Sequence, residues 1–187
     1  MDKLSDKKRA IFDSTLELVR DHGFHGTTMN QVAKNASVAA GTIYHYFDSK
    51  DQLVCELYHY NRDLVIRVIE EAIEEQSSCK ENYSNIWSSL YRFYVRNTDT
   101  LIFFEQFINS PYNTNKDHAH YQGPLYQFFK TGSEKGQLKS IKPEIAIVLT
   151  MSSIASTAKL NKFGKISLSD HDLENIVDIL WDGIARH

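Results

Sequence analysis

Residues 42–53 read TIYHYFDSKDQL and place three aromatic rings, a histidine and a lysine immediately before a helix-start signal. Ile43 and Phe47 are four residues apart, so on a helix they share one face. Tyr44 and His45 then lie on the opposite side of that helix. We therefore predict a short helix that is buried along one face and exposed along the other, with a second helix directly after it.

The residues before this stretch predict a partner helix. Thr28 is followed three residues later by Gln31, which is the spacing of a capping box at a helix N-terminus. The face of this helix that is expected to be buried consists of Met29, Val32, Ala33 and Ala36. After a short break at residues 35–37, the next helix is predicted over residues 39–47. Two short helices joined by a tight turn form a helix-turn-helix, here over about residues 28–47.

Longer amphipathic helices flank this motif. Residues 5–22 carry a stripe at spacings of three and four, formed by Ile11, Thr15, Leu18, Val19 and His22. Gly23 can adopt the left-handed conformation that commonly ends a helix. Ser49 and Gln52 repeat the capping-box spacing, and an apolar stripe after them indicates a long helix to about Glu75.

The remaining sequence also predicts helices and no strand. Only 8 glycines and 3 prolines punctuate 187 residues, whereas strands need a turn every ~10 residues. Amphipathic or apolar segments are expected over residues 83–97, 100–109, 118–135, 143–162 and from residue 169 onward. The predicted fold is all-α, with about nine helices.

Composition and charge exclude several classes of protein. No run of ~18 apolar residues and no basic-then-apolar leader is visible, so we expect no membrane span, no secretory signal and a cytoplasmic location. Cys55 and Cys79 show no zinc spacing, and no nucleophile–base pair or glycine-rich phosphate loop suggests an enzyme, a metal or a cofactor. The net charge of -3 argues against a general nucleic-acid binder. Residues 1–52 carry seven basic and seven acidic side chains, so DNA binding would have to come from a few well-placed groups.

Such groups converge around the predicted helix of residues 39–47. Thr42 and His45 are suited to base edges in a major groove, and the Tyr44 hydroxyl is suited to a phosphate oxygen. Phosphate contacts are also expected from side chains at two helix N-termini, namely Thr27, Thr28 and Lys50.

At this point two stretches carry a family resemblance. GFHGTTMNQVAKNASV (residues 23–38) and GTIYHYFDSKDQL (residues 41–53) resemble the DNA-binding domain of the TetR/AcrR family of transcriptional regulators. The resemblance implies that residues 39–47 form the recognition helix. It also implies DNA contacts by Thr28, Thr42, Tyr44, His45 and Lys50.

The resemblance covers about residues 5–55 and has consequences for the whole chain. It implies an N-terminal three-helix DNA-binding domain over residues 5–65 and a helical effector-binding and dimerisation domain over residues 66–187. Two departures stand out, because the family commonly has glycine in place of Ser37 and Ser-Lys in place of Ala39–Ala40. Ala39 cannot cap a helix, so Ser37 is the alternative cap, and Ala40 could instead touch a thymine methyl group.

Aromatic residues are concentrated between residues 83 and 129. This segment holds thirteen of the twenty-two aromatic residues and only six charged ones. Core packing explains any single ring, but ligand pockets are also lined mostly by apolar and aromatic groups. We therefore hypothesise an effector cavity for an uncharged or amphipathic organic molecule, bordered by Trp87, Tyr91, Phe104, Phe107, Tyr112, Phe128 and Met151.

The last two predicted helices carry a different pattern. Residues 150–158 are rich in small side chains, and residues 173–184 add a broad apolar stripe. This pattern fits an internal core or a two-fold four-helix dimer interface, and the family resemblance favours the interface. The candidate interface residues are Ser152, Ala155, Ile176, Leu180, Trp181 and Ile184. A homodimer would place two recognition helices on a pseudo-palindromic double-stranded DNA operator.

The functional prediction is a one-component regulator, most simply a repressor that a small hydrophobic or aromatic effector releases from its operator. The long helix over residues 49–75 would link the two domains, and the effector would shift the population of subunit arrangements. Two alternatives remain, a helical enzyme that keeps a DNA-binding head and a partner-binding adaptor. His118 and His120 suggest a metal pair, but residues two apart point in different directions on a helix, which favours solvated surface.

Overall fold

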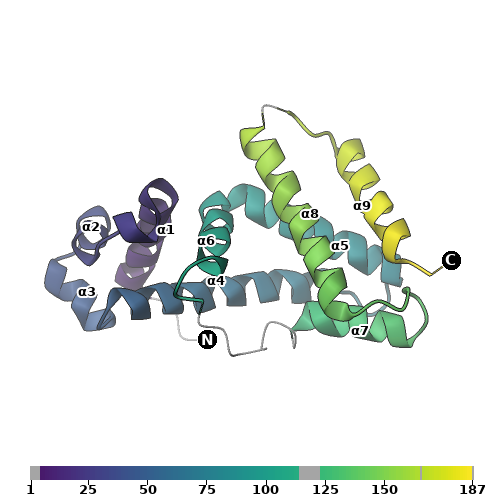
Figure 1. Cartoon of the computed structure of the whole chain (residues 1–187), viewed down its shortest axis with the longest axis horizontal. Coiled ribbons are helices and arrows are strands. Elements are labelled where there is room, and N and C mark those ends of the chain that lie inside the picture. The colour runs from purple at the N-terminus through teal and green to yellow at the C-terminus, as the bar shows by residue number, and fades with distance from the viewer. Residues whose placement is uncertain (1–4, 114–122, 165, 187) are drawn as a thin grey trace. The chain divides into compact units, whose positions relative to one another are not determined.

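The computed structural model describes residues 5–113, 123–164 and 166–186 of the chain (Figure 1). In these ranges the fold is all-α, as predicted, and no strand occurs. The nine described helices are α1 (Asp6–Gly26), α2 (Met29–Asn35), α3 (Ala40–Tyr46), α4 (Lys50–Ala72), α5 (Cys79–Arg96), α6 (Thr98–Ile108), α7 (Pro124–Glu134), α8 (Pro143–Phe163) and α9 (Asp170–Ile184).

The packing of the helices divides the chain into two compact units. Unit 1 comprises Met1–Arg62 and Thr98–Thr114, and unit 2 comprises Asp63–Asn97 and Asn115–His187, in each case as far as the chain is described. α6 therefore packs within unit 1, although the chain passes through α5 of unit 2 before reaching it. The sequence-based boundary at residue 65 was placed by expected function and not by packing, and it stays a prediction.

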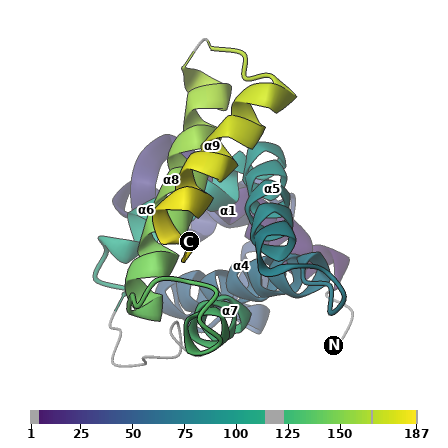
Figure 2. The same ribbon diagram turned by 90° about the vertical axis from the view of Figure 1, so that its right-hand side faces the viewer.

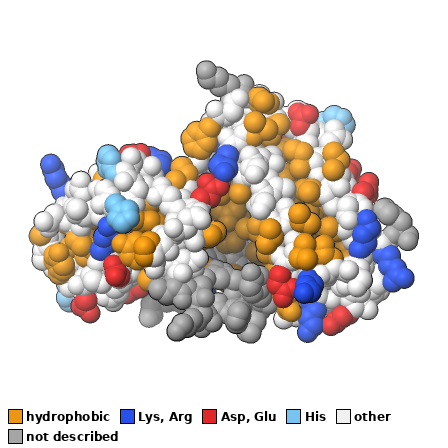
Figure 3. Space-filling view, in the orientation of Figure 1, with side chains coloured by type: hydrophobic (Ala, Val, Ile, Leu, Met, Phe, Trp, Pro, Cys, Tyr) orange, Lys and Arg blue, Asp and Glu red, His pale blue; other side chains and the backbone are white. Residues whose placement is uncertain are grey.

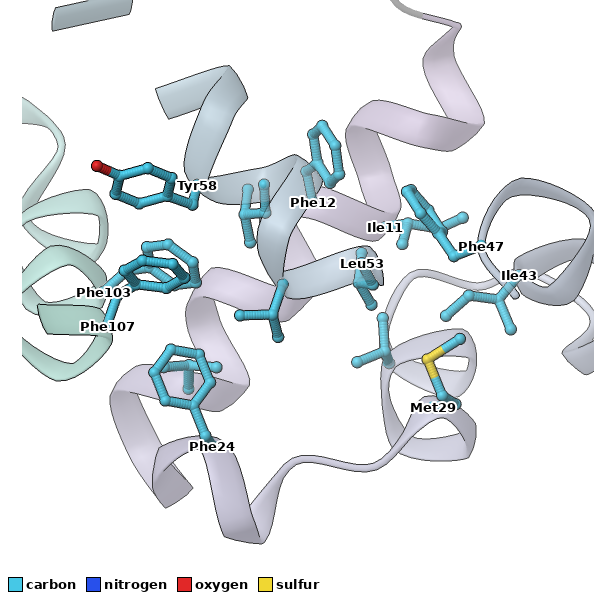
Figure 4. Close-up of a cluster of buried hydrophobic side chains, with 14 of the residues drawn as sticks. Ile11, Phe12, Phe24, Met29, Ile43, Phe47, Leu53, Tyr58, Phe103 and Phe107 are labelled. Carbon is cyan, nitrogen blue, oxygen red and sulfur yellow. The ribbon is translucent and has the colours of Figure 1, made fainter. Parts of the chain in front are cut away.

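The core of unit 1 is built from apolar faces of α1, α2, α3 and α4 (Figure 4). Ile11, Ile43 and Leu57 are fully buried, and the ring of Phe12 lies 5.7 Å from the ring of Phe47, centre to centre. Full burial of an apolar side chain of this size contributes about 1.5–3 kcal/mol. The α3 helix is held in place by this burial, because a seven-residue helix is too short to be stable alone in water.

The α6 helix adds a second layer of aromatic packing to unit 1. Phe103 meets Phe24 edge to face, with ring centres 5.5 Å apart. Phe107 stacks on Tyr58 of α4 at 4.1 Å, with the ring planes 11° apart (Figure 4). Thr100 donates a hydrogen bond to the buried amide of Asn61 at 3.2 Å. These contacts fix α6 against α1 and α4.

The α1 helix bends at Gly23. Its φ of 67° lies in the left-handed region that favours glycine, as the sequence predicted for a helix end. The chain then makes a further helical turn to Gly26 rather than stopping at the bend. His22, predicted to lie on the buried stripe, is exposed at the end of the straight part of the helix.

The α5 helix is the centre of unit 2 and packs against α8 and α9 (Figure 2). Ile86, Trp87 and Leu90 are fully buried along one side of it. The indole N–H of Trp87 donates to the hydroxyl of Ser153 on α8 at 3.0 Å. The α7 helix packs against α8, and a single bridge joins Leu138 to Ala185 beyond α9.

Several helix ends differ from the prediction for local reasons. α5 starts at Cys79 rather than at residue 83, because Ser78 and Glu81 form a complete capping box. α9 starts next to Ser169, as predicted, and Ser169 caps it, because its hydroxyl accepts from the backbone N–H of Asp172. α7 is described from Pro124, and the earlier part of the predicted segment lies outside the described residues.

Candidate DNA-binding surface

The α2 and α3 helices form a helix-turn-helix. The predicted capping box is present, because the Thr28 hydroxyl accepts from the Gln31 backbone N–H at 3.3 Å and the Gln31 side chain accepts from the Thr28 N–H at 2.9 Å. The turn between the helices contains Ser37 at a φ of 54°. The following N–H, of Val38, donates to the carbonyl of Ala33 at 2.9 Å and closes the turn. A serine therefore adopts the left-handed conformation for which glycine is usual.

The α3 helix has the two faces that the sequence predicted. Ile43 and Phe47 are 0% exposed, whereas Tyr44 is 52% exposed and His45 is also exposed. Thr42 is half-buried, and Ala40 is exposed in the first turn. Side chains suited to bases and phosphates thus share the outward side of a helix whose inward side is fixed by the core.

The C-terminal end of α3 is tied to α1 by groups that sequence reasoning missed. The Tyr46 hydroxyl lies 3.1 Å from the Ser5 hydroxyl, which also caps α1. The Lys8 ammonium bonds the Glu56 carboxylate at 2.8 Å and lies 5.3 Å from the centre of the Phe47 ring. Nothing in the sequence near Lys8 indicates that this lysine lies against the ring of Phe47, about 40 residues later.

Lys50 lies in the first turn of α4, as predicted, and its ammonium donates to the backbone carbonyl of Phe24. This bond joins the start of α4 to the bent end of α1. Thr28 is exposed at the start of α2, where its hydroxyl serves the capping box. Lys50 and Thr28 both lie beside the helix-turn-helix. The polar group of each already makes a hydrogen bond within the protein.

Two sequence-based assignments in this region are wrong. Thr27 is 2% exposed, and its hydroxyl donates to the Gly23 carbonyl at 2.9 Å, so it stabilises the bend of α1 and is not presented to a phosphate. Ser37 does not cap α3. The N-cap residue is Ala39, which makes no side-chain hydrogen bond because alanine has no polar side-chain group, and Ser37 lies two residues earlier, in the turn.

The seven predicted pocket residues do not line one cavity within a single unit. Phe104, Phe107 and Tyr112 belong to unit 1 and pack with its core, whereas Trp87, Tyr91, Phe128 and Met151 belong to unit 2. Trp87 is fully buried and stacks on Tyr91 at 5.5 Å, with the ring planes 13° apart. Packing within each unit therefore accounts for the positions of Trp87 and Phe107. The amino-acid composition gives the number of aromatic rings but does not show which residues each ring contacts.

The predicted interface residues differ in their exposure within the protomer. Ile184 is 6% exposed and is buried within the protomer, so it is not a surface residue. Trp181 is half-buried against Tyr83, with ring centres 5.6 Å apart. Ser152 is exposed, and Ala155, Ile176 and Leu180 are half-buried. The most exposed apolar side chains of α8 and α9 were missed, namely Ile145, Val148, Leu149, Phe163 and Ile179.

The chemistry of the rest of the described chain is limited. Its residues contain no cluster of three or more His, Cys, Asp or Glu side chains able to hold a metal ion, and His118 and His120 lie outside them. Burial raises the pKa of both thiols, Cys55 and Cys79, which disfavours the reactive thiolate. Within the same ranges, the helices lack a stretch long and apolar enough to cross a membrane.

Comparison with known proteins agrees with this architecture. Residues 11–57 match the family described as bacterial regulatory proteins, tetR family, and residues 78–185 match the Tetracyclin repressor-like C-terminal domain. A solved TetR family transcription regulator from Marinobacter aquaeolei superimposes with a TM-score of 0.90 at 23% identity, over 97% of both chains.

Two curated relatives extend the comparison to sequence. An uncharacterized HTH-type transcriptional regulator of Haemophilus influenzae is 26% identical over 97% of both chains. The fatty acid metabolism regulator protein of Bacillus subtilis is 33% identical over 82 residues, which are 44% of this chain and 42% of that protein. The matched families and relatives are transcriptional regulators and not enzymes.

Proposed function

The chain belongs to the TetR family of DNA-binding transcriptional regulators, and on that premise we propose that it is a one-component repressor released from its operator by a small apolar effector. The observation that carries the proposal is the two-faced α3 helix. Its inward residues are fully buried, so the outward side chains of Tyr44 and His45 are presented on a rigid element. Side chains that read base edges in a major groove must be held in a fixed position.

The contacts that we propose divide into two kinds. Tyr44 and Lys50 bind phosphates and set the position of α3 on the duplex, together with the N-terminus of α2 at Thr28. Thr42 and His45 read base edges, and Ala40 meets a thymine methyl group. The N-terminal part of the chain has no excess of basic side chains, so specific affinity depends on these few groups.

We propose a homodimer that uses the outward side of α8 and α9. Figure 3 shows hydrophobic side chains gathered on the surface over α8. Ile145, Leu149, Leu160 and Phe163 recur at helical spacing on α8 and are 49%, 50%, 39% and 59% exposed. The predicted Ser152 lies in the same stripe, and its small side chain permits close helix approach. Ile179 of α9 is 72% exposed. Exposed apolar side chains that gather on one surface typically mark an interface.

The effector is proposed to bind in the C-terminal region, residues 78–185, which matches the repressor-like domain. Tyr91, Phe128 and Met151 remain the candidate lining residues in unit 2. Medium- and long-chain fatty acids are the first class to test, because one relative is a fatty acid metabolism regulator and such molecules are amphipathic. A regulator of this kind acts in the cytoplasm, where its operator DNA lies.

The experiment that tests DNA recognition is a gel-shift titration with the DNA upstream of the protein's own gene and an excess of unrelated competitor DNA. A repressor predicts a complex that survives competitor, and a partner-binding adaptor predicts one that competitor removes. Addition of fatty acids and of uncharged aromatic compounds should then release the complex. An operator complex that ignores the whole panel would refute release by an apolar effector.

A further inference from the structure

Gly41 lies in the middle of the outward face of α3. It stands four residues before His45, so these two residues share one side of the helix. Ile43 and Phe47 share the opposite side and point into the core of unit 1 (Figure 4). Gly41 and His45 are both exposed. One of the two positions at the centre of the exposed face therefore carries no side chain.

The fold gives no reason for a glycine at position 41. Glycine is typically required where φ is positive or where another segment approaches the backbone closely. Among the described glycines, a positive φ occurs at Gly23 and Gly136 and not at Gly41. Apart from the adjoining part of α3, no heavy atom of the described residues lies within 4 Å of the place that a Cβ of residue 41 would occupy. An alanine would therefore fit without a clash.

The glycine also weakens the helix in which it lies. Relative to alanine, a glycine inside a helix lowers the folding equilibrium constant by about two- to fivefold. The α3 helix has only seven residues and depends on burial of its inward face. A residue that weakens so short a helix, and that the packing of the protomer does not require, indicates a requirement outside the protomer.

We propose that Gly41 is a positioning residue for DNA recognition. Its bare backbone lies against the base-pair edges in the major groove, and this close approach brings His45, one turn later, to a base edge. An α-helix with its side chains is about 10–12 Å across and the groove is about 12 Å wide, so a side chain at position 41 holds α3 away from the bases. This role is steric, and it rests on the DNA-binding function proposed above.

The test measures the binding of Gly41→Ala to two duplexes of equal length by fluorescence anisotropy. One duplex is the sequence that the unaltered protein enriches most from a random pool, and the other is unrelated. We expect Gly41→Ala to bind the enriched duplex at least about tenfold more weakly, because the added methyl group overpacks the contact in both half-sites. Binding to the unrelated duplex depends on phosphate contacts and should change less than about threefold.

Urea unfolding of the same variant separates this role from damage to the fold. Gly41→Ala should increase the folding equilibrium constant by about two- to fivefold while operator binding falls. Gly183→Ala is the matched control for folding, because Gly183 is also an exposed glycine within a helix, with open space around the place of a Cβ. It should show a similar gain in folding.

A double-mutant cycle tests whether the bare position serves His45. His45→Ala should weaken binding to the enriched duplex in the unaltered background and much less in the Gly41→Ala background, because α3 is already held away from the bases there. Losses that simply add would contradict this link.

Three further results would overturn the proposal. Full affinity of Gly41→Ala for the enriched duplex would refute the role of Gly41 and leave the proposed function standing. A lower folding equilibrium constant in Gly41→Ala would show that the fold itself needs the glycine. If the unaltered protein enriched no sequence and bound all duplexes equally, the proposed function and the role of Gly41 would both be refuted.

Discussion

The Tyr44→Phe substitution isolates one phosphate contact. The hydroxyl is on a side chain that is 52% exposed, and in the described part of the chain it has no hydrogen-bond partner, so its removal should leave the melting temperature unchanged. A hydrogen bond to a charged acceptor contributes about 1.5 kcal/mol at the lower end of its range. A dimer loses two such bonds, about 3 kcal/mol, which corresponds to a roughly 100-fold weaker operator complex.

Fluorescence anisotropy with a labelled operator measures this loss directly. Because tyrosine carries no charge, the slope of log affinity against log salt should stay the same. Tyr46→Phe is the matched control, since its hydroxyl meets Ser5 at 3.1 Å within the protein. That variant should keep operator affinity within about threefold. An unchanged affinity for Tyr44→Phe, or a loss that parallels a fall in melting temperature, would refute the phosphate contact.

Four further outcomes follow from the structure. Lys50→Ala should lower the salt slope by about 2 per dimer, measured by the same titration, and an unchanged slope would contradict a phosphate contact. Ser37→Gly should raise the free energy of unfolding in urea by about 0.5–1 kcal/mol, because it relieves the φ of 54°, and a decrease would contradict strain there. Leu149→Glu should give monomers in sedimentation velocity, whereas Ile108→Glu, 63% exposed in unit 1, should stay dimeric. Trp87→Phe should cost about 1–3 kcal/mol in urea unfolding through the lost Ser153 bond and volume, and no change would refute the core role of Trp87.

The helix-turn-helix was predictable because its signals are local. The capping box of Thr28 and Gln31 is a spacing of three, and the two faces of α3 follow from Ile43 and Phe47 standing four residues apart. Such patterns are complete within one or two turns of helix. The same logic located the left-handed Gly23, since few other residues accept that conformation.

Contacts between residues that are far apart in the sequence could not be predicted from such local patterns. α6 is apolar on most sides, so its periodicity does not indicate that Phe103 and Phe107 pack against α1 and α4. The packing of Phe107 and Trp87 could not be predicted for this reason, because each ring has a partner far away in the sequence, and the pocket hypothesis stays a prediction. The burial of Thr27 was missed because the bend at Gly23 supplies its acceptor, and the extra turn after the bend carries no sequence signal.

Selection of binding sites from a pool of random duplexes tests most directly whether the outward face of α3 reads DNA sequence. The unaltered protein should enrich a pseudo-palindrome, and His45→Ala should lose base preference at symmetric positions in both half-sites while keeping the remaining motif. Enrichment of no motif by the unaltered protein, or of an identical motif by His45→Ala and Thr42→Ala, would contradict recognition by this helix.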